Sequence, residues 1–297
     1  MSSLAGQVVF ITGAARGIGA GTARALAKRG ARLILIDLDA EPLEELAAEL
    51  GEDRALAAAC DVCDLEAMES AAAAGVERFG GIDRVLANAG VASYGSVAAV
   101  DPAMFKRVLD VNQLGVFHTV RATLPSVIER RGYYLIVSSE AAFAPGPGMA
   151  AYCMSKAGVE HFASTLRLEV AHQGVDVGSA HMSWIDTPLV QDAKADLPSF
   201  REMLSSLPGP LGRTIPLERC AEAFADGLEQ RRRRVYIPRW VGLLAWLKPV
   251  TTTAFGEREP LKQVPRMLPM MDAEVAELGR STSARNVAMR DAGVTHE

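Results

Sequence analysis

The 297-residue chain has few cysteines, few aromatic residues and no uninterrupted apolar run long enough to cross a membrane. A spanning helix needs about 18 or more apolar residues, so we expect no spanning segment. Four cysteines in a chain of this length are typical of a reducing, cytoplasmic setting rather than of a secreted disulfide scaffold. Cys60 and Cys63 have the spacing of a metal or redox pair, but no second pair or histidine cluster accompanies them. We therefore expect buried or half-buried thiols there, and no metal.

An excess of basic residues is also absent. The formal net charge is −5, which argues against nucleic acid as a partner. The first residues run directly into the apolar stretch AGQVVFITG, without the pattern of a secretory signal. The chain does have apolar content: 49% of its residues are hydrophobic, which is enough for a large core, and its length suits one α/β domain.

Apolar runs alternate with helical patterns through most of the chain. Strands rich in Val, Ile and Leu that are separated by helices are typical of a parallel sheet covered on both faces. The pattern predicts a single doubly wound, Rossmann-like α/β domain with three α/β/α layers. Pro125 predicts a bend or break in its helix. The expected strands lie within 7–13, 32–37, 54–62, 83–90, 133–139 and 175–182, and the expected helices are 17–29, 41–51, 64–80, 104–131 and 150–174.

Behind the sixth strand this regular pattern loosens. Residues 186–214 mix polar and apolar side chains around several prolines, and we expect a mobile substrate lid there. A helix over 218–234 ends in four arginines, whose positive charge suits a helix C-terminus. We assign residues 1–240 to the catalytic domain with its lid, and 241–297 to a partly helical C-terminal extension. Residues 280–297 have no clear period and are expected to form a flexible tail.

A glycine-rich turn, ITGAARGIG, follows the first predicted strand. Gly13, Gly17 and Gly19 would let the backbone approach a pyrophosphate, and the next helix offers free N–H groups at its N-terminus. The second strand ends at Asp37, whose carboxylate suits ribose hydroxyls and would repel a 2′-phosphate. Arg16 could reach such a phosphate, but we expect the repulsion by the carboxylate to prevail. The sequence therefore favours NAD over NADP.

A second group of polar residues surrounds the fifth predicted strand. Ser139 follows that strand, and Tyr152 and Lys156 lie four residues apart in the next helix, so they share one face. A free tyrosine has a pKa of about 10. A neighbouring lysine charge should lower that pKa and make the phenol a usable acid or base. A serine hydroxyl could hold the oxygen whose proton is exchanged. The Tyr–Lys spacing alone is weakly specific, because it occurs by chance in many helices.

Taken together, these motifs resemble the short-chain dehydrogenase/reductases. The resemblance covers about residues 5–240 and points to the branch with a TGxxxGxG turn rather than to the longer, epimerase-like branch. Each motif is modest by itself, but six in the family's order, each on the expected element, are highly specific. They are TGAARGIG, the CDV of 60–62, the NAG of 88–90, the VN of 111–112, Ser139, and Tyr152-x-x-x-Lys156.

The resemblance implies a catalytic tetrad of Asn112, Ser139, Tyr152 and Lys156. Tyr152 would exchange a proton with the substrate oxygen, Lys156 would lower its pKa and bind the nicotinamide ribose, and Ser139 would polarise the oxygen. Asn112 would hold a water that links Lys156 to solvent. Ser138 is the rival for the serine role, but the family's usual gap to the tyrosine favours Ser139.

The resemblance also implies how a nicotinamide cofactor would be bound for hydride transfer. Asp61 and Val62 would contact adenine, and Ile185 and Thr187 would bind the carboxamide. The chain departs from the family where Ser183 and Trp184 replace the usual Pro-Gly, and Trp184 either shapes the pocket or packs in the core. The implied cofactor-binding residues are Gly13, Arg16, Gly17, Ile18, Gly19, Asp37, Asp61, Val62, Asn88, Ala89, Gly90, Tyr152, Lys156, Ile185 and Thr187.

The leading hypothesis is an NAD(H)-dependent oxidoreductase that interconverts a secondary alcohol and a ketone. One alternative is a catalytically silent NAD-binding sensor or scaffold, and another is a lipid reductase that rests on a membrane surface through residues 240–250. By resemblance we expect a homo-dimer or homo-tetramer formed through the helices of 104–131 and 150–174. Apolar residues of the lid and extension favour a hydrophobic substrate such as a steroid, a lipid-derived alcohol or a terpenoid. They are Leu189, Leu197, Phe200, Met203, Leu204, Trp240, Leu243 and Leu244.

Overall fold

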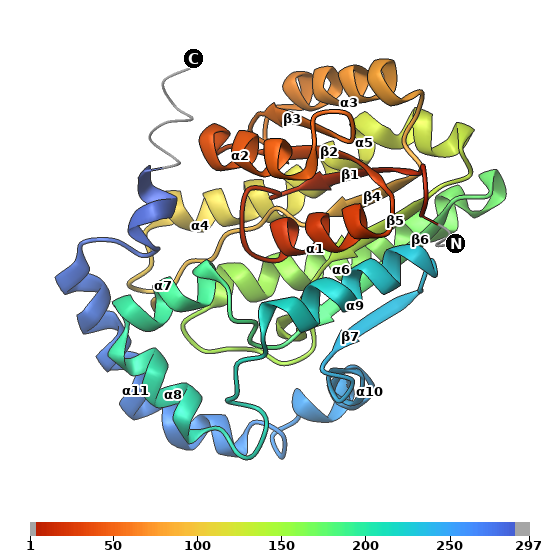
Figure 1. Ribbon diagram of the computed structural model, residues 1–297. Coiled ribbons are helices and arrows are strands. Elements are labelled where there is room, and N and C mark those ends of the chain that lie inside the picture. The colour runs from red at the N-terminus through yellow and green to blue at the C-terminus, as the bar shows by residue number, and fades with distance from the viewer. Residues whose placement is uncertain (1–3, 289–297) are drawn as a thin grey trace.

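Seven parallel strands form the centre of the computed structural model, which describes residues 4–288 (Figure 1). Their order is β3-β2-β1-β4-β5-β6-β7, so the chain winds outward from β1 in one direction and from β4 in the other. This arrangement confirms the predicted doubly wound parallel sheet. The strands are β1 (Val8–Thr12), β2 (Arg32–Asp37), β3 (Ala55–Ala59), β4 (Arg84–Ala87), β5 (Tyr133–Val137), β6 (Asp176–Met182) and β7 (Arg234–Ile237).

Helices cover both faces of the sheet and bury alternate residues of each strand. In β1, Val9 and Ile11 face one layer of helices, while Val8 and Phe10 face the other. The predicted single domain with three α/β/α layers is therefore confirmed. The first layer contains α1 (Gly17–Lys28), α2 (Ala40–Leu50) and α9 (Leu217–Glu229), and the second contains α3 (Leu65–Phe79), α5 (Gly115–Glu129) and α6 (Ala150–Val170).

The helix predicted over 104–131 consists of three consecutive segments. α4 (Pro102–Leu109) begins at Asp101, whose carboxylate accepts a hydrogen bond from the Ala103 N–H at 2.9 Å. A π-helical turn (Asp110–Leu114) follows, and α5 continues from it. Of the bend or break predicted at Pro125, the break is wrong, because Pro125 lies inside α5. A proline removes one helical hydrogen bond, and the buried face of α5 packs on the sheet and keeps the helix in place.

Residues 186–214, the segment of the expected mobile lid, contain regular helices. They include α7 (Pro188–Asp196) and α8 (Pro198–Ser206). Each helix has proline at its first position, where the fixed φ and the missing N–H are tolerated. The prolines that suggested a loop therefore begin helices. Val190, Phe200 and Leu204 of this segment pack with Met271 and Val275 in an apolar cluster.

Beyond residue 240 the described chain includes helices α10 (Val241–Thr251) and α11 (Arg258–Leu278), and α11 lies along α8 (Figure 1). The flexible tail expected from residue 280 is wrong for its first residues. Ser281 and Thr282 are buried, and Thr282 Oγ1 donates to the Ala92 carbonyl at 2.8 Å. Residues 289–297 of that expectation lie outside the described part of the chain.

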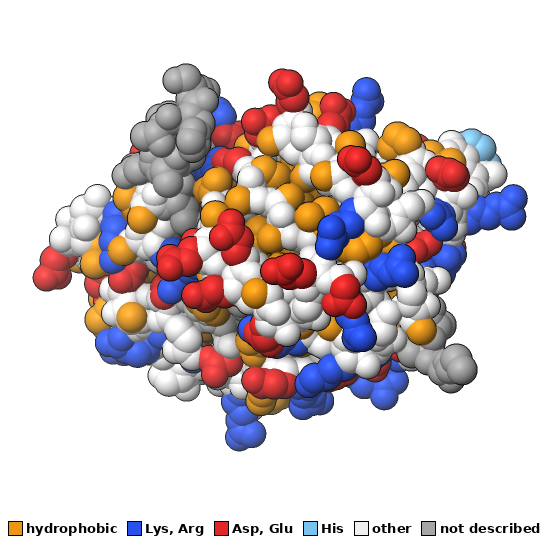
Figure 2. All heavy atoms as spheres, turned by 45° about the horizontal axis from the view of Figure 1, so that its top comes forward, with side chains coloured by type: hydrophobic (Ala, Val, Ile, Leu, Met, Phe, Trp, Pro, Cys, Tyr) orange, Lys and Arg blue, Asp and Glu red, His pale blue; other side chains and the backbone are white. Residues whose placement is uncertain are grey.

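The helix predicted over 218–234 ends at Glu229, before its arginines. Arg234 instead opens β7, where its guanidinium pairs with Glu160 at 2.7 Å. On the face shown in Figure 2, acidic and basic side chains are interspersed and form no continuous basic patch. Between residues 4 and 288, no helix combines the length and the apolarity that crossing a bilayer requires.

Candidate active site

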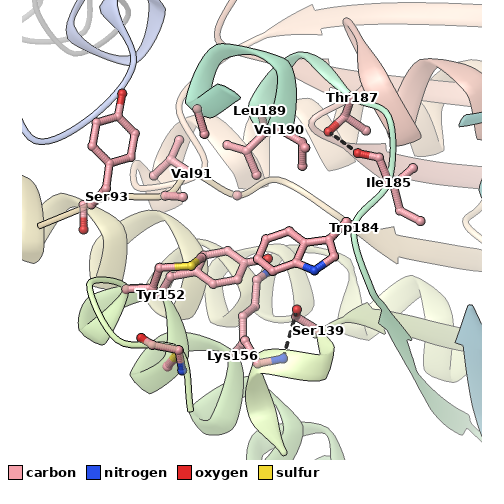
Figure 3. A pocket seen from close by; sticks show the side chains of 18 of the residues that line it. Val91, Ser93, Ser139, Tyr152, Lys156, Trp184, Ile185, Thr187, Leu189 and Val190 are labelled. Carbon is pink, nitrogen blue, oxygen red and sulfur yellow. Dashed lines mark hydrogen bonds between the residues drawn. The ribbon is translucent and has the colours of Figure 1, made fainter. Parts of the chain in front are cut away.

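A cavity of about 650 Å³ lies at the C-terminal edge of the central strands (Figure 3). Its walls come from the glycine turn after β1, the loops after β4 and β5, helices α7 and α8, and helix α11. Ligands of open α/β sheets bind at this edge, where the strand order reverses between β1 and β4. All the predicted site residues line this cavity except Gly19 and Asn112, which lie behind its wall.

The glycine turn brings the N-terminus of α1 to the cavity. A β-carbon on Gly13, which has a φ of +65°, would lie 2.8 Å from the Ala89 Cα. A β-carbon on Gly19 would lie 2.0 Å from the Gly13 carbonyl oxygen. Only glycine permits this close packing of the turn on the helix. No side chain caps the N-terminus of α1, so its first N–H groups suit an anion such as a pyrophosphate.

Asp37 closes the same end of the cavity. Its carboxylate accepts hydrogen bonds from the Ala15 N–H at 2.9 Å and the Asp39 N–H at 3.1 Å, and burial raises its pKa. Arg16, which could have met a phosphate, pairs with Asp39. The end of β2 therefore presents a fixed acid and an arginine that already has a partner. This donor and acceptor set fits the ribose of a dinucleotide.

The walls beside this end are held by short hydrogen bonds. Asp61 receives the Arg107 guanidinium at 2.7 Å, and the Val62 carbonyl lies 2.9 Å from His118 Nδ1. The Asn88 amide donates to the carbonyls of Thr12 and Gly13 at 3.0 and 3.1 Å. The Asn88 bonds join the loop after β4 to the end of β1, and the other two join the segment after β3 to α4 and α5.

At the other end, Ser139, Tyr152 and Lys156 converge below Trp184 (Figure 3). Tyr152 and Lys156 lie on the first turns of α6, with the Lys156 Nζ 5.6 Å from the centroid of the Tyr152 ring. Lys156 Nζ donates to the Val137 carbonyl at 3.0 Å. The Ser138 hydroxyl donates to the Lys156 carbonyl at 2.9 Å, which leaves Ser139 as the serine beside the phenol.

Burial is the main cause of the pKa shifts of Tyr152 and Lys156. It raises the pKa of Tyr152 to about 12, although the Ser139 hydroxyl acts in the opposite direction. Burial also lowers the pKa of Lys156 to about 8. The shift of Tyr152 is opposite to the sequence expectation. Burial removes the phenolate form of Tyr152 from water, and this cost exceeds the stabilisation by the Ser139 hydroxyl. Burial likewise disfavours the charged form of Lys156.

Asn112 supports the site from behind. The π-helical turn directs its side chain inward, where the amide donates to the Val91 carbonyl at 3.0 Å and to Ser155 Oγ at 2.9 Å. Its Oδ1 accepts the Val91 N–H at 2.8 Å. Both amide hydrogens are therefore used by the protein. A water on this side chain could only donate to the remaining lone pair of Oδ1.

Glu140 is a site residue that sequence reasoning missed. It lines the cavity next to Ser139 and accepts a hydrogen bond from the Ser183 hydroxyl at 3.0 Å. Burial raises its pKa to about 7. Nothing in the spacing of the sequence distinguishes Glu140 from a surface acid, because its burial arises from the packing of separate segments.

The part of the cavity beyond Trp184 is apolar. Of the eight apolar residues singled out from the sequence, five line it: Leu189, Leu197, Phe200, Met203 and Leu244. Trp184 itself both lines the cavity and packs on Phe200, with ring centroids 5.3 Å apart. Further lining residues that the sequence did not indicate are Met149, Val264, Met267 and Met271.

A cluster of three polar residues joins the C-terminus of α7 to the chain beyond α11. The Arg280 guanidinium donates to both Asp196 oxygens at 2.6 and 2.8 Å, and the Tyr94 hydroxyl donates to Asp196 at 2.5 Å. Arg280 also donates to the Thr282 carbonyl at 2.6 Å. We refer to Tyr94, Asp196 and Arg280 as the clasp. It connects the C-terminus of α7, the loop after β4 and the segment after α11.

Metal chemistry has no evident centre in the part of the chain that the structure describes. There, no three His, Cys, Asp or Glu side chains gather as a metal site would require. Cys60 lies 3.7 Å from the Met68 sulfur, and burial raises the pKa of the Cys60 thiol to about 11. A thiol in this state is a poor nucleophile and a poor metal ligand at neutral pH.

Comparison with known proteins gives a consistent result. The sequence model of the short chain dehydrogenase family matches residues 7–198. The chain is 33% identical over 232 residues to oxidoreductase UcpA of Salmonella typhimurium, covering 76% of this chain and 87% of that protein. It is also 33% identical over 234 residues to the mitochondrial (-)-isopiperitenol/(-)-carveol dehydrogenase of Mentha piperita, with the same coverage.

A solved structure agrees with these sequence relatives. The 3-ketoacyl-(acyl-carrier-protein) reductase of Brucella melitensis, crystallised with NADH, superposes with a TM-score of 0.70 at 29% identity. The match covers 79% of this chain and 97% of that one, so about a fifth of this chain has no counterpart there. The fold, the cavity at the edge of the sheet and the family match agree. The chain belongs to the short-chain dehydrogenase/reductase family, whose members are oxidoreductases that bind a nicotinamide cofactor.

Proposed function

We propose that the protein is an NAD(H)-dependent oxidoreductase that interconverts a secondary alcohol and a ketone. The observation that carries this proposal is the shared cavity. The glycine turn and Asp37 lie at one end, and Ser139, Tyr152 and Lys156 lie at the other. A site that holds a nicotinamide and a carbonyl compound side by side needs both groups of residues.

The residues of the chain supply the proton and the orientation. A nicotinamide cofactor held along the glycine turn and Asp37 would supply or accept the hydride at the substrate carbon. In reduction the Tyr152 hydroxyl donates its proton to the carbonyl oxygen, and the Ser139 hydroxyl donates a hydrogen bond to the same oxygen. A raised pKa keeps the phenol protonated at neutral pH, which is the form that reduction requires. In oxidation the phenolate must form first, and a positive charge on Lys156 stabilises it.

The proposed preference for NAD rests on the end of β2. A 2′-phosphate would lie beside the Asp37 carboxylate, with which no cation of residues 4–288 is directly paired. Arg16 has Asp39 as its partner and would have to break that pair to bind the phosphate. Repulsion of the phosphate and the absence of a ready cation both favour NAD.

The proposed substrate is hydrophobic. Trp184, Phe200 and Met271 supply large apolar surfaces to the part of the cavity beyond the catalytic residues. A relative named for two alcohols, isopiperitenol and carveol, agrees with an alcohol as the substrate. The burial of an apolar substrate in this part of the cavity would stabilise its complex.

An NAD(H)-linked activity screen tests this proposal. The purified protein is assayed with hydrophobic secondary alcohols plus NAD, and with the corresponding ketones plus NADH. We expect turnover of at least one pair, and lower activity with NADP and NADPH. Normal NADH binding without turnover across the panel would instead support the silent sensor or scaffold.

A further inference from the structure

Helix α10 carries a stripe of apolar side chains that faces outward. Leu243, Trp246, Leu247 and Val250 follow the spacing that places residues on one helix face. Trp246 is 86% exposed and Leu243 is 60% exposed. Phe255, in the turn after α10, is 74% exposed and extends the group, which we call the α10 stripe. Clustered large apolar side chains at a surface mark an interaction site more often than scattered ones do.

The opposite side of α10 is fixed to the domain. Val241 is fully buried and packs with Ala142 and Phe143, which follow Ser139 closely in the chain. The Thr251 hydroxyl donates to the Phe143 carbonyl at 3.2 Å. These contacts hold both ends of α10 against the domain, and its outer face stays exposed because no other described segment packs over it.

The charge around the stripe differs from that of the whole chain. Residues 239–258 contain three basic side chains and one acidic side chain, a net charge of +2, whereas the chain as a whole carries −5. Arg239 lies just before α10, Lys248 lies within α10, and Arg258 begins α11. An exposed apolar surface with basic neighbours matches the headgroup region of an anionic bilayer.

The same segment also borders the active-site cavity. Leu244 of α10 and Pro260, Val264 and Met267 of α11 line its apolar part. One side of this segment therefore faces the cavity, and the other carries the α10 stripe. A compound dissolved in a lipid bilayer would therefore contact the stripe and the cavity wall on the same segment of the protein.

We propose that the α10 stripe rests on an anionic lipid surface as a peripheral contact, through which a lipid-dissolved substrate reaches the cavity. The lipid contact does not depend on the proposed function. Only the proposed route of the substrate rests on that function. A second copy of the chain is the less favoured occupant. Other exposed apolar residues, Phe117 on α5 and Met154 and Leu168 on α6, provide a separate face for self-association.

Vesicle flotation of the full chain tests the contact without cofactor or substrate. Vesicles of phosphatidylcholine alone are compared with vesicles that also contain phosphatidylserine. We expect binding to the anionic vesicles, weaker binding at high salt, and little binding to the neutral ones. The double variant Trp246→Ser/Phe255→Ser should lose about tenfold or more in partitioning, because the apolar area it removes drives insertion.

The controls separate this proposal from its rivals. Val97→Ser, which changes a similarly exposed residue outside the stripe, should float like the wild type. Tyr152→Phe should also float like the wild type, so a failure of the proposed catalysis leaves this test intact. Equal partitioning of the double variant and the wild type would overturn the proposal. So would a lower oligomeric mass of the double variant together with no vesicle binding by the wild type, since the stripe would then be an interface between copies.

Discussion

Tyr152, Lys156 and Glu140 all have pKa shifts that favour their uncharged forms. Burial raises the pKa of Tyr152 to about 12 and that of Glu140 to about 7, and lowers that of Lys156 to about 8. At the scale of residues, the catalytic end of the cavity is thus a place where charge is costly. Charge that develops on a substrate oxygen there would depend on the hydrogen bonds from Ser139 and Tyr152.

The Glu140 shift predicts a pH-dependent cost to stability. Below pH 4.5 the carboxyl is protonated in both folded and unfolded chains, so it costs nothing. As the pH rises through 4.5 to 7, the unfolded chain releases its proton while the fold retains it, and this cost persists above pH 7. Glu140→Gln should therefore raise the unfolding temperature relative to the wild type at pH 8 but not at pH 4.5.

Thermal unfolding followed by circular dichroism at both pH values measures this difference. Glu44→Gln, which changes an exposed acid on α2, is the control and should give the wild-type profile. The same temperature difference between Glu140→Gln and the wild type at both pH values would contradict the assigned burial of the carboxyl.

A second residue-scale prediction concerns cofactor choice. Asp37→Asn keeps an oxygen that can accept the Ala15 N–H but removes the negative charge. The ratio of NADH to NADPH affinity should fall by about tenfold or more, which corresponds to about 1.4 kcal/mol. Fluorescence titration of both cofactors measures the ratio, with the exposed Asp53→Asn as the control. An unchanged ratio for Asp37→Asn would show that this carboxylate does not select NAD.

At the scale of elements, we expect the clasp to help hold α7 and α8 over the cavity. Arg280→Ala removes a bidentate, partly buried pair, a contact of about 1–3 kcal/mol at most. We expect faster amide hydrogen exchange in residues 188–206 and a higher KM for the substrate. Arg24→Ala, which breaks a similar bidentate pair with Glu49 far along the chain, should leave that exchange unchanged. Equal protection of 188–206 in Arg280→Ala and the wild type would rule out this role.

Some elements of the fold and site could be predicted from the sequence alone, and others could not. The strand Val8–Thr12, the glycine turn and Asp37 depend on local pattern and spacing, and they were placed correctly on the sheet. The helices α7 and α8 were missed because their prolines read as loop signals rather than as helix starts. The π-helical turn around Asn112 has no sequence pattern that separates it from an α-helix.

Sequence patterns did not predict the contacts between segments that are distant along the chain. Asp196 and Arg280 are 84 residues apart, and neither has neighbours that indicate a partner. The position of Met271 in the cavity wall could not be predicted either, because it depends on how α11 packs against α8. The substrate end of the cavity is built from such contacts, whereas the cofactor end is built from consecutive βα units.

At the scale of the whole molecule, α5 and α6 expose apolar side chains that a second copy could cover. We propose that copies associate through this face, which includes Phe117, Met154 and Leu168, together with Leu114 in the π-helical turn before α5. Light scattering should give the mass of a dimer or tetramer for the wild type and a lower mass for Phe117→Glu/Leu168→Glu, because buried charges oppose association. Trp246→Ser should keep the wild-type mass. A monomeric wild type would contradict the proposed assembly.

The central claim is that the Tyr152 hydroxyl exchanges the proton that accompanies hydride transfer. Tyr152→Phe removes that hydroxyl and little else. With a substrate identified by the screen, steady-state turnover should fall by about 100-fold to 10,000-fold, the usual contribution of a general acid or base. NADH affinity should stay close to that of the wild type, and Tyr236→Phe, outside the cavity, should keep full turnover. Wild-type turnover by Tyr152→Phe would contradict the claim.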